Sequence, residues 1–175
     1  LQKIDVIDTD KLKDLIDKKA LEEFRNRAMN PNKPAIFGTA QNEDIYFQNT
    51  EVRNGYYDKV PDIVNEYMKE INKITGGNYK PFNYYGSNEA TRVIVAMGSV
   101  CETVKETVDY LVNNKNEAVG LLEVHLYRPF STKYFLKALP KTVKKIAVLD
   151  RTKEAGSSGE PLYLDVVQTI KNVDA

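Results

Sequence analysis

Residues 92–97 read Arg-Val-Ile-Val-Ala-Met, a run of β-branched and small apolar side chains that is typical of a buried strand. Gly98 and Ser99 follow as turn residues, and residues 99–114 then carry apolar side chains at helical intervals. The same order of strand, turn and helix recurs twice. The further strands are expected over 118–126 and 145–150, and the further helices over 131–138 and from Pro161 to Ile170. Three such units predict an α/β fold.

The strands of these units are expected to lie parallel, because a strand–helix–strand connection crosses over the sheet, and it does so with a right hand. We therefore expect an open, mainly parallel sheet with helices on both faces over residues 86–175.

Residues 1–85 read differently, as a helical and loop-rich extension. Apolar residues at three- and four-residue intervals predict a helix over 10–29, with a break near Lys19, and another over 58–75. Residues 34–57 mix polar and aromatic side chains without a period, so an ordered loop is expected there.

The composition excludes several classes of protein. Lys and Arg total 25 and so do Asp and Glu, so no basic excess favours nucleic acid or an anionic membrane. Cys101 is the single cysteine and His125 the single histidine, which excludes an internal disulfide, a cysteine-ligated cluster and a multi-histidine metal site. No signal peptide or membrane span is expected, and the compartment is predicted to be reducing and cytoplasmic.

Ligands of open parallel sheets collect at the carboxyl ends of the strands, where three loops are expected here. The turn at Gly98 could offer backbone amides to a phosphate, but Ser99 and Glu102 have the spacing of a capping box, the favoured interpretation. The segment from Asp150 to Gly159 is expected to be a solvated connector rather than a phosphate cradle.

Two arginines follow the second and third predicted strands. Arg128 and Arg151 carry planar donors suited to a carboxylate or a phosphate, and we expect both to make interdomain contacts from the same sheet edge. His125 has no nucleophile near it in the sequence, so a structural or interface role is favoured over a triad. Cys101, flanked by valines, is expected to be an inert core thiol.

Aromatic residues are dense in the extension, with seven tyrosines between Tyr46 and Tyr85. Stacking on nucleic-acid bases would need a basic surface as well, which this segment lacks. Packing against a neighbouring domain is the favoured interpretation.

Five stretches resemble the pyruvate:ferredoxin (flavodoxin) oxidoreductase family. They are GTAQNEDIYFQ at 38–48, YDKVPDIV at 57–64, VIVAMGSVCET at 93–103, LYRPF at 126–130 and IAVLDRTKE at 146–154. The resemblance spans nearly the whole chain. It implies an interior fragment, with residues 1–85 as the tail of a thiamine-related domain. Residues 86–175 would form a domain similar to the carboxy-terminal domain of transketolase, truncated at its end.

The resemblance further implies a parent enzyme that oxidatively decarboxylates pyruvate with coenzyme A, using thiamine diphosphate, magnesium and 4Fe-4S clusters. Ferredoxin or flavodoxin would take the electrons, and the parent would be a homodimer. No catalytic, cofactor-binding or metal residue of the family falls on a matched position, so this piece is expected to be a non-catalytic interdomain module. A stand-alone phosphate-binding α/β module is the alternative.

Overall fold

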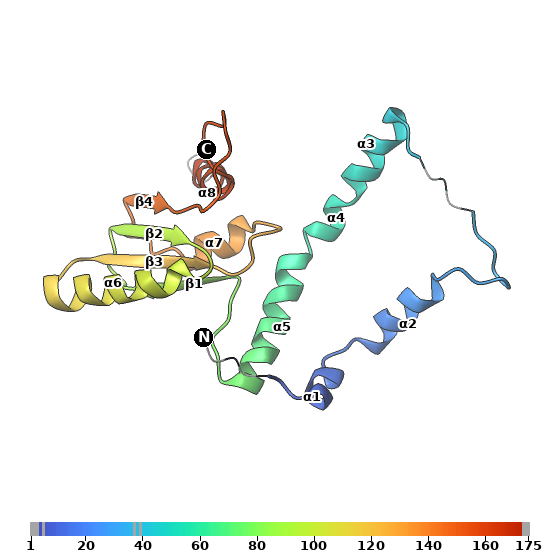
Figure 1. Cartoon of the computed structure of the whole chain (residues 1–175), viewed down its shortest axis with the longest axis horizontal. Coiled ribbons are helices and arrows are strands. Elements are labelled where there is room, and N and C mark those ends of the chain that lie inside the picture. Colours follow the sequence, from blue (N-terminus) through green and yellow to red (C-terminus); the bar gives the residue numbers. More distant parts are fainter. Residues whose placement is uncertain (1–3, 5, 37, 39, 173–175) are drawn as a thin grey trace.

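The computed structural model describes residues 4, 6–36, 38 and 40–172. Its first part is a chain of helices, and its second part is a sheet flanked by helices (Figure 1). The helices of the first part are α1 (Thr9–Asp14), α2 (Lys18–Asn26), α3 (Glu43–Val52), α4 (Asn54–Tyr57) and α5 (Val60–Thr75). The second part contains β1 (Phe82–Gly86), β2 (Arg92–Ala96), α6 (Val100–Lys115), β3 (Val119–Val124), α7 (Thr132–Ala138), β4 (Lys145–Val148) and α8 (Pro161–Lys171).

The sheet has the strand order β1-β3-β2-β4. β2 pairs in parallel with both β3 and β4, which confirms the predicted parallel α/β sheet. β1 was not predicted. It pairs antiparallel with β3 at the opposite edge from β4. Its sequence, Phe-Asn-Tyr-Tyr-Gly, has an aromatic pair in place of a clean alternation, and this obscures the two-residue period of a strand.

Two hydrophobic cores lie on the two faces of the sheet, because successive side chains of a strand point to opposite faces. On one face, Val93 and Val95 pack with Leu162 and Val166 of α8 and with Phe135 of α7. On the other face, strand residues pack against α6; this smaller core consists of Ala96, Cys101, Val104, Val108 and Leu121. Helices therefore cover both faces, as predicted.

An aromatic trio closes the end of the larger core. Phe135 is fully buried, with the ring of Phe82 edge-on at 5.6 Å and the ring of Phe130 at 5.6 Å. Phe82 and Phe130 also meet edge-to-face at 5.3 Å. Edge-to-face pairs at such distances add to the stabilisation from burial alone, so this trio fixes α7 against β1.

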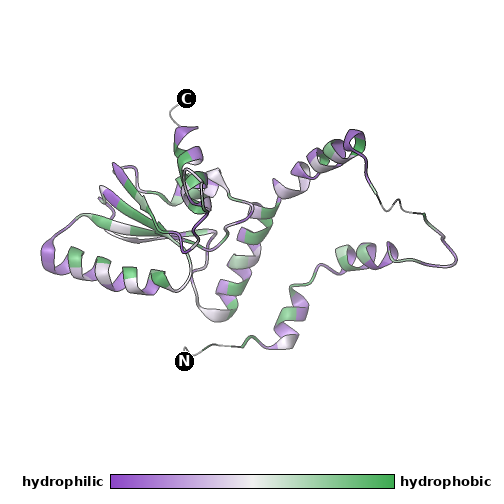
Figure 2. Cartoon of the chain, turned by 45° about the horizontal axis from the view of Figure 1, so that its top comes forward, coloured by the Kyte–Doolittle hydropathy of each residue, from purple (hydrophilic) through white to green (hydrophobic). Residues whose placement is uncertain are grey.

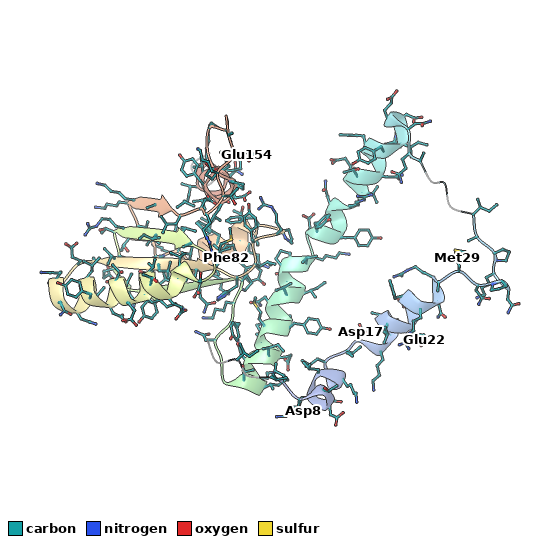
Figure 3. The ribbon with its side chains drawn as sticks, in the orientation of Figure 1. Asp8, Asp17, Glu22, Met29, Phe82 and Glu154 are labelled. Carbon is teal, nitrogen blue, oxygen red and sulfur yellow. The ribbon has the colours of Figure 1, made fainter. Side chains whose placement is uncertain are left out.

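Helices α1 and α2 of the extension start at local polar caps rather than at a core. Asp8 accepts a hydrogen bond from the Asp10 amide at 2.8 Å, and Asp17 accepts one from the Ala20 amide at 3.0 Å. Each aspartate satisfies one of the free amides at a helix start (Figure 3). The break between α1 and α2 therefore falls at residues 15–17, just before the predicted position at Lys19.

The expectation of a loop over 34–57 is wrong for its second half, because α3 and α4 occupy 43–57. Glu43 and Asp44 stand in the first turn of α3, where negative charge stabilises a helix. The aromatic residues stand in adjacent pairs, Tyr46–Phe47 and Tyr56–Tyr57, so they mark no single helix face and the helical period is hidden. Helix α5 was predicted, with Pro61 near its start and Gly76 in the left-handed conformation (φ 71°) at its end.

The extension buries almost nothing of itself. Within its described residues, Pro61 is the first buried side chain in chain order. Phe24 is 66% exposed and Met29 is 89% exposed. Figure 2 shows hydrophobic residues along these helices; α1 to α4 lie apart from the sheet, whereas α5 runs beside the sheet domain and contacts α7. Among the described residues, no helix combines the length and the hydropathy that crossing a bilayer requires.

Candidate functional site

The carboxyl ends of the parallel strands are the place where an α/β sheet binds ligands. Here β2 leads into the turn at Gly98, β3 into residues 125–131 and β4 into residues 149–160. A charged group at this edge is available to a ligand only where it is not already paired within the fold.

A charged cluster centres on Glu123, near the end of β3. Lys105 Nζ of α6 lies 3.2 Å from Glu123 Oε2 and 2.9 Å from Glu102 Oε1. His125 Nε2 lies 3.7 Å from Glu123 Oε1. The hydrogen bond to Glu102, followed by the contact with Glu123, raises the pKa of Lys105 despite partial burial. The cluster therefore stays ion-paired at neutral pH and fastens α6 to the sheet.

Cys101 lies beside this cluster and is 1% exposed. Burial, followed by the negative charge of Glu123, raises the pKa of its thiol to about 11. A thiol with such a pKa is protonated and unreactive at neutral pH. The thiol lies in the core, as predicted, and its lack of reactivity stays a prediction.

The predicted capping box at the start of α6 is wrong. Ser99 has a helical backbone conformation and its side chain makes no capping hydrogen bond. Glu102 instead bonds to Lys105, three residues later on the same helix. Glu102 thus forms an ion pair with Lys105 in place of a hydrogen bond to the backbone amide at the start of α6. Lys105 also contacts Glu123.

The glycine-containing loop after β4 is tied down by its own acidic residues. Asp150 Oδ2 accepts a hydrogen bond from the Tyr163 amide in the first turn of α8 at 3.2 Å. Glu160 accepts from Lys153 Nζ at 2.9 Å and from the Glu154 amide at 2.7 Å, and these two bonds lower the pKa of Glu160. The amide of Tyr163, one of those that could hold a phosphate, is therefore occupied by Asp150.

Arg128 has partners inside the chain. Its Nη1 lies 2.6 Å from Asp165 Oδ2 of α8, and its guanidinium carbon lies 4.0 Å from the centre of the Tyr127 ring. Arg151 is exposed, just beyond β4. Arg128 follows β3 and Arg151 follows β4, and β2 lies between these two strands in the sheet. Both arginines therefore lie at the carboxyl ends of the strands, but not on neighbouring strands. Their predicted interdomain contacts stay a prediction.

His125 joins the sheet to the connection between α5 and β1. Its Nδ1 lies 3.0 Å from the carbonyl oxygen of Lys80, and its ring meets Tyr79 edge-on at 5.9 Å. Because a carbonyl oxygen only accepts, Nδ1 must carry the proton. The described contacts of His125 are with a backbone carbonyl, an aromatic ring and a carboxylate, which agrees with the structural role predicted for it.

The carboxylates described at the carboxyl edge of the sheet are engaged with partners of the same chain. Within the described residues, no group of three or more His, Cys, Asp or Glu side chains could hold a metal ion. Likewise, no buried side-chain nitrogen or oxygen there lacks a hydrogen-bond partner. A diphosphate–metal site would need carboxylate or amide oxygens aimed at the ion, whereas the carboxylates Glu102, Glu123 and Glu160 are paired with lysines.

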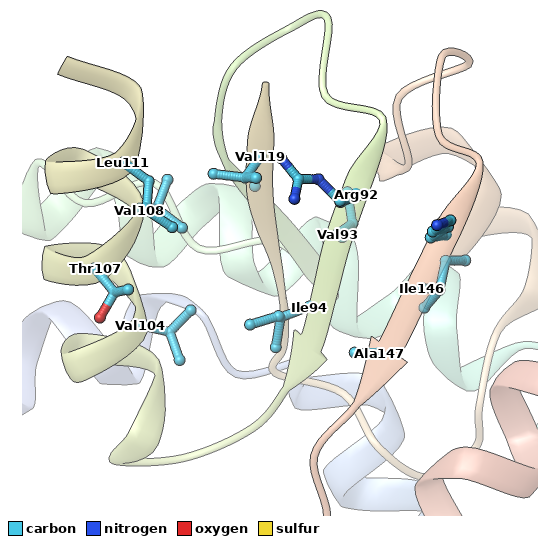
Figure 4. Close-up of a pocket in the computed structure, with 12 residues that line it drawn as sticks. Arg92, Val93, Ile94, Val104, Thr107, Val108, Leu111, Val119, Ile146 and Ala147 are labelled. Atoms are coloured by element: carbon cyan, nitrogen blue, oxygen red, sulfur yellow. The ribbon is translucent and has the colours of Figure 1, made fainter. Parts of the chain in front are cut away.

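Two grooves on the described part of the chain were not predicted from the sequence. An apolar groove of about 380 Å³ lies between α6 and the strands β2 and β4 (Figure 4). Val104, Val108 and Leu111 form its helix side, and Ile94 and Ala147 form part of its floor. A polar groove of about 960 Å³ lies between α5, the following connection and α7. Both grooves join elements distant in sequence, so no local motif signals them.

Two family sequence models match the chain. One, described as pyruvate:ferredoxin oxidoreductase core domain II, matches residues 90–175. The other, described as pyruvate flavodoxin/ferredoxin oxidoreductase, thiamine diP-binding, matches residues 1–69.

Curated relatives match along almost the entire chain. A pyruvate-flavodoxin oxidoreductase of Enterobacter agglomerans is 55% identical over 99% of this chain and 15% of its own length. A pyruvate:ferredoxin oxidoreductase of Moorella thermoacetica is 55% identical over 97% of this chain and 14% of its own length. A pyruvate dehydrogenase [NADP(+)] of Cryptosporidium parvum is 48% identical over 97% of this chain and 9% of its own length. The chain thus spans a small part of each relative.

Proposed function

The chain belongs to the pyruvate:ferredoxin (flavodoxin) oxidoreductase family, and from this premise we propose that it is a non-catalytic interdomain piece of such an enzyme. The parent oxidatively decarboxylates pyruvate with coenzyme A to acetyl-CoA and carbon dioxide, and passes the two electrons to ferredoxin or flavodoxin. Thiamine diphosphate with magnesium, and iron–sulfur clusters, belong to other parts of the parent.

The observation that carries this proposal is the pairing of charges at the carboxyl edge of the sheet. Lys105, Glu123 and Glu160 are each engaged with partners inside the chain, and so is Arg128. At the described carboxyl edge, groups paired in this way stabilise the fold and are not free to act as an acid or a base. A supporting domain still matters to catalysis, because reacting groups must be held accurately in place.

The printed names of the relatives add a second support. Proteins named for flavodoxin, ferredoxin and NADP(+) share this stretch at about half identity or more. Because this stretch is common to proteins named for different electron acceptors, it is better suited to a shared structural role than to selecting the acceptor.

Within this proposal, residues 1–85 belong to the preceding thiamine-related domain and residues 86–175 to the transketolase-like α/β domain. Strand β1 runs across this division and pairs with β3, which gives the two parts a covalent and hydrogen-bonded joint. Arg128 and Arg151 would contact other domains of the parent, a homodimer in the cytoplasm. The alternative of a stand-alone phosphate-binding module is not favoured, since Asp150 already caps the start of α8.

The test compares the purified chain with its full-length parent in one assay. Both receive pyruvate, coenzyme A, thiamine diphosphate, magnesium and a one-electron viologen dye, and circular dichroism with a cooperative unfolding transition verifies that the chain is folded. We expect the parent to reduce the dye and the chain to give only the background rate. Pyruvate-dependent dye reduction by the chain alone would overturn the proposal.

A further inference from the structure

Helices α3, α4 and α5 follow one another as a nearly continuous rod over residues 43–75 (Figure 1). The residues at the two junctions, Arg53, Asp58 and Lys59, also have right-handed helical backbone angles. Hydrogen bonds run across the junctions, from the Tyr57 amide to the Arg53 carbonyl and from the Ile63 amide to the Lys59 carbonyl. The rod therefore presents defined faces along its whole length.

One face of this rod carries an apolar stripe with intervals of seven and four residues in regular alternation. The stripe consists of Ile45, Val52, Tyr56, Ile63, Tyr67 and Ile74. An interval of eleven residues is close to three helical turns, so this repeat returns to the same face over the length of the rod. No member of the stripe is charged.

The stripe is open to solvent. Five of its members are between 44% exposed, at Tyr67, and 74% exposed, at Tyr56; Ile74 is partly buried. A row of large apolar side chains along one helix face is a feature of interaction surfaces, whereas single exposed apolar residues are common on any protein.

Helix α5 makes its polar contacts with the sheet domain on a side that excludes the stripe; Pro61 is buried there, and Val64, Met68 and Ile71 are partly buried. Asp62 bonds to Lys133 and Tyr134 of α7, and Asn72 bonds to the backbone of Tyr79. Neither hydrophobic core of the sheet includes a described residue of α5. An amphipathic helix normally buries its apolar stripe, so the partner of this stripe lies elsewhere.

We propose that the stripe is the docking surface for an apolar helix face of the thiamine diphosphate-binding domain of the same parent polypeptide. The family model for that domain matches residues 1–69, which include Ile45 through Tyr67. The relatives are about seven times as long as this chain, which leaves ample polypeptide to supply the partner. This inference rests on the proposed function, since it requires the chain to be part of such an enzyme.

The spacing argues against a left-handed coiled coil with a second copy of the rod. Two-stranded left-handed coiled coils require apolar residues every 3.5 residues on average, whereas an eleven-residue repeat gives about 3.67. Such a stripe drifts only slightly around the helix and suits packing against the side of a domain. Tyr56 and Tyr67 add hydroxyl groups that need a hydrogen-bond acceptor on the partner.

The test replaces Tyr56 with the photo-crosslinker p-benzoylphenylalanine in the full-length parent, with Asn54→p-benzoylphenylalanine, on the opposite side of the rod, as the matched control. Mixed light and heavy nitrogen labelling separates crosslinks within one polypeptide from those between copies. We expect the Tyr56 variant to crosslink to the thiamine diphosphate-binding domain of its own polypeptide, and the Asn54 variant to give far less of that product.

Hydroxyl-radical oxidation of the unmodified proteins gives a second readout that does not depend on the variant folding. Tyr56 and Tyr67 should be several-fold less oxidised in the parent than in the 175-residue chain. Crosslinks to a second copy or to another protein, or equal oxidation in the two proteins, would overturn the docking surface. The dye-reduction assay uses neither variant, so failure of the proposed function is detected separately.

Discussion

The hydroxyl of Tyr134 on α7 donates a hydrogen bond of 2.7 Å to the Asp62 carboxylate on α5, 72 residues away in sequence. Lys133 Nζ approaches the same oxygen at 2.8 Å. These polar contacts fasten the helical rod to the sheet domain without an apolar core between them. They lower the pKa of Asp62, first through Lys133 and then through Tyr134. Burial, followed by Asp62, raises the pKa of Tyr134 to about 12.

The Asp62–Tyr134 contact should give stability a defined pH dependence. A lowered carboxyl pKa stabilises the fold above its usual value of 3.8, and this contribution is lost as the pH falls through the folded pKa. A raised phenol pKa stabilises the fold below its usual value of 10.0, and this is lost as the pH rises toward about 12.

The variant Tyr134→Phe should therefore be less stable than the wild type by a constant amount from about pH 5 to 9, with a smaller difference above about pH 10. Urea unfolding across this range measures it, and Tyr110→Phe, on exposed α6 surface, is the control. A deficit that does not change at alkaline pH would contradict the assignment.

Cys101 should resist alkylation in the folded chain. A pKa of about 11 in place of 9.0 leaves ~100-fold less thiolate at pH 8, and burial slows access further. Because Cys101 is the single cysteine, iodoacetamide labelling reports on it alone. The labelling rate should rise steeply above about pH 10 and become fast at pH 8 in denaturant. Rapid labelling of the folded chain at pH 8 would show that the thiol is accessible.

The aromatic trio should be the most sensitive part of the larger core. Phe135→Ala removes a fully buried ring between Phe82 and Phe130, and we expect it to cost about 3–5 kcal/mol of unfolding free energy. Tyr110→Ala removes a ring that is 51% exposed and should cost much less. Chemical denaturation measures the unfolding free energy of the two variants. Similar losses of unfolding free energy would mean that α7 does not anchor the core.

Arg128 and Arg151 should matter more in the parent than in the isolated chain. Arg128→Ala breaks the contact with Asp165 in both proteins, and an interdomain contact would add a further loss in the parent alone. Arg151 is exposed in the chain, so Arg151→Ala should leave the chain unchanged and destabilise the parent. Melting temperature and dye-reduction rate of the parent are the measurements, with Lys137→Ala as the control. Unchanged activity and stability in both parent variants would remove the interdomain role.

The sheet domain was predictable because its signals are local. The run at 92–97 and the helix from Pro161 each show their period within one element, and the structure contains both. Strand β1 was not predicted because its place in the sheet depends on pairing with β3, almost forty residues away. Helices α3 and α4 were missed because the adjacent aromatic residues Tyr46–Phe47 and Tyr56–Tyr57 point in different directions around a helix and mark no single apolar face within a short window.

The carboxyl edge was predictable in position but not in its pairing. Sequence order places Glu123, His125 and Arg128 near the end of a strand, and the structure does the same. Which partner each one takes depends on where α6 and α8 pack. Lys105 of α6 reaches Glu123 of β3, and Glu102 pairs with the same lysine rather than closing a capping box with Ser99. The orientation of α5 was likewise hidden, since periodicity identifies an apolar face without saying what covers it.

The central claim is that these 175 residues support a catalytic site held elsewhere in the parent. Isothermal titration calorimetry of the folded chain tests it, with thiamine diphosphate plus magnesium in one titration and coenzyme A in another, and with the full-length parent as the positive control. We predict heats of dilution alone from the chain and saturable binding from the parent. Stoichiometric binding of either ligand to the chain would contradict the claim and would direct attention to the loops at Gly98 and Gly156.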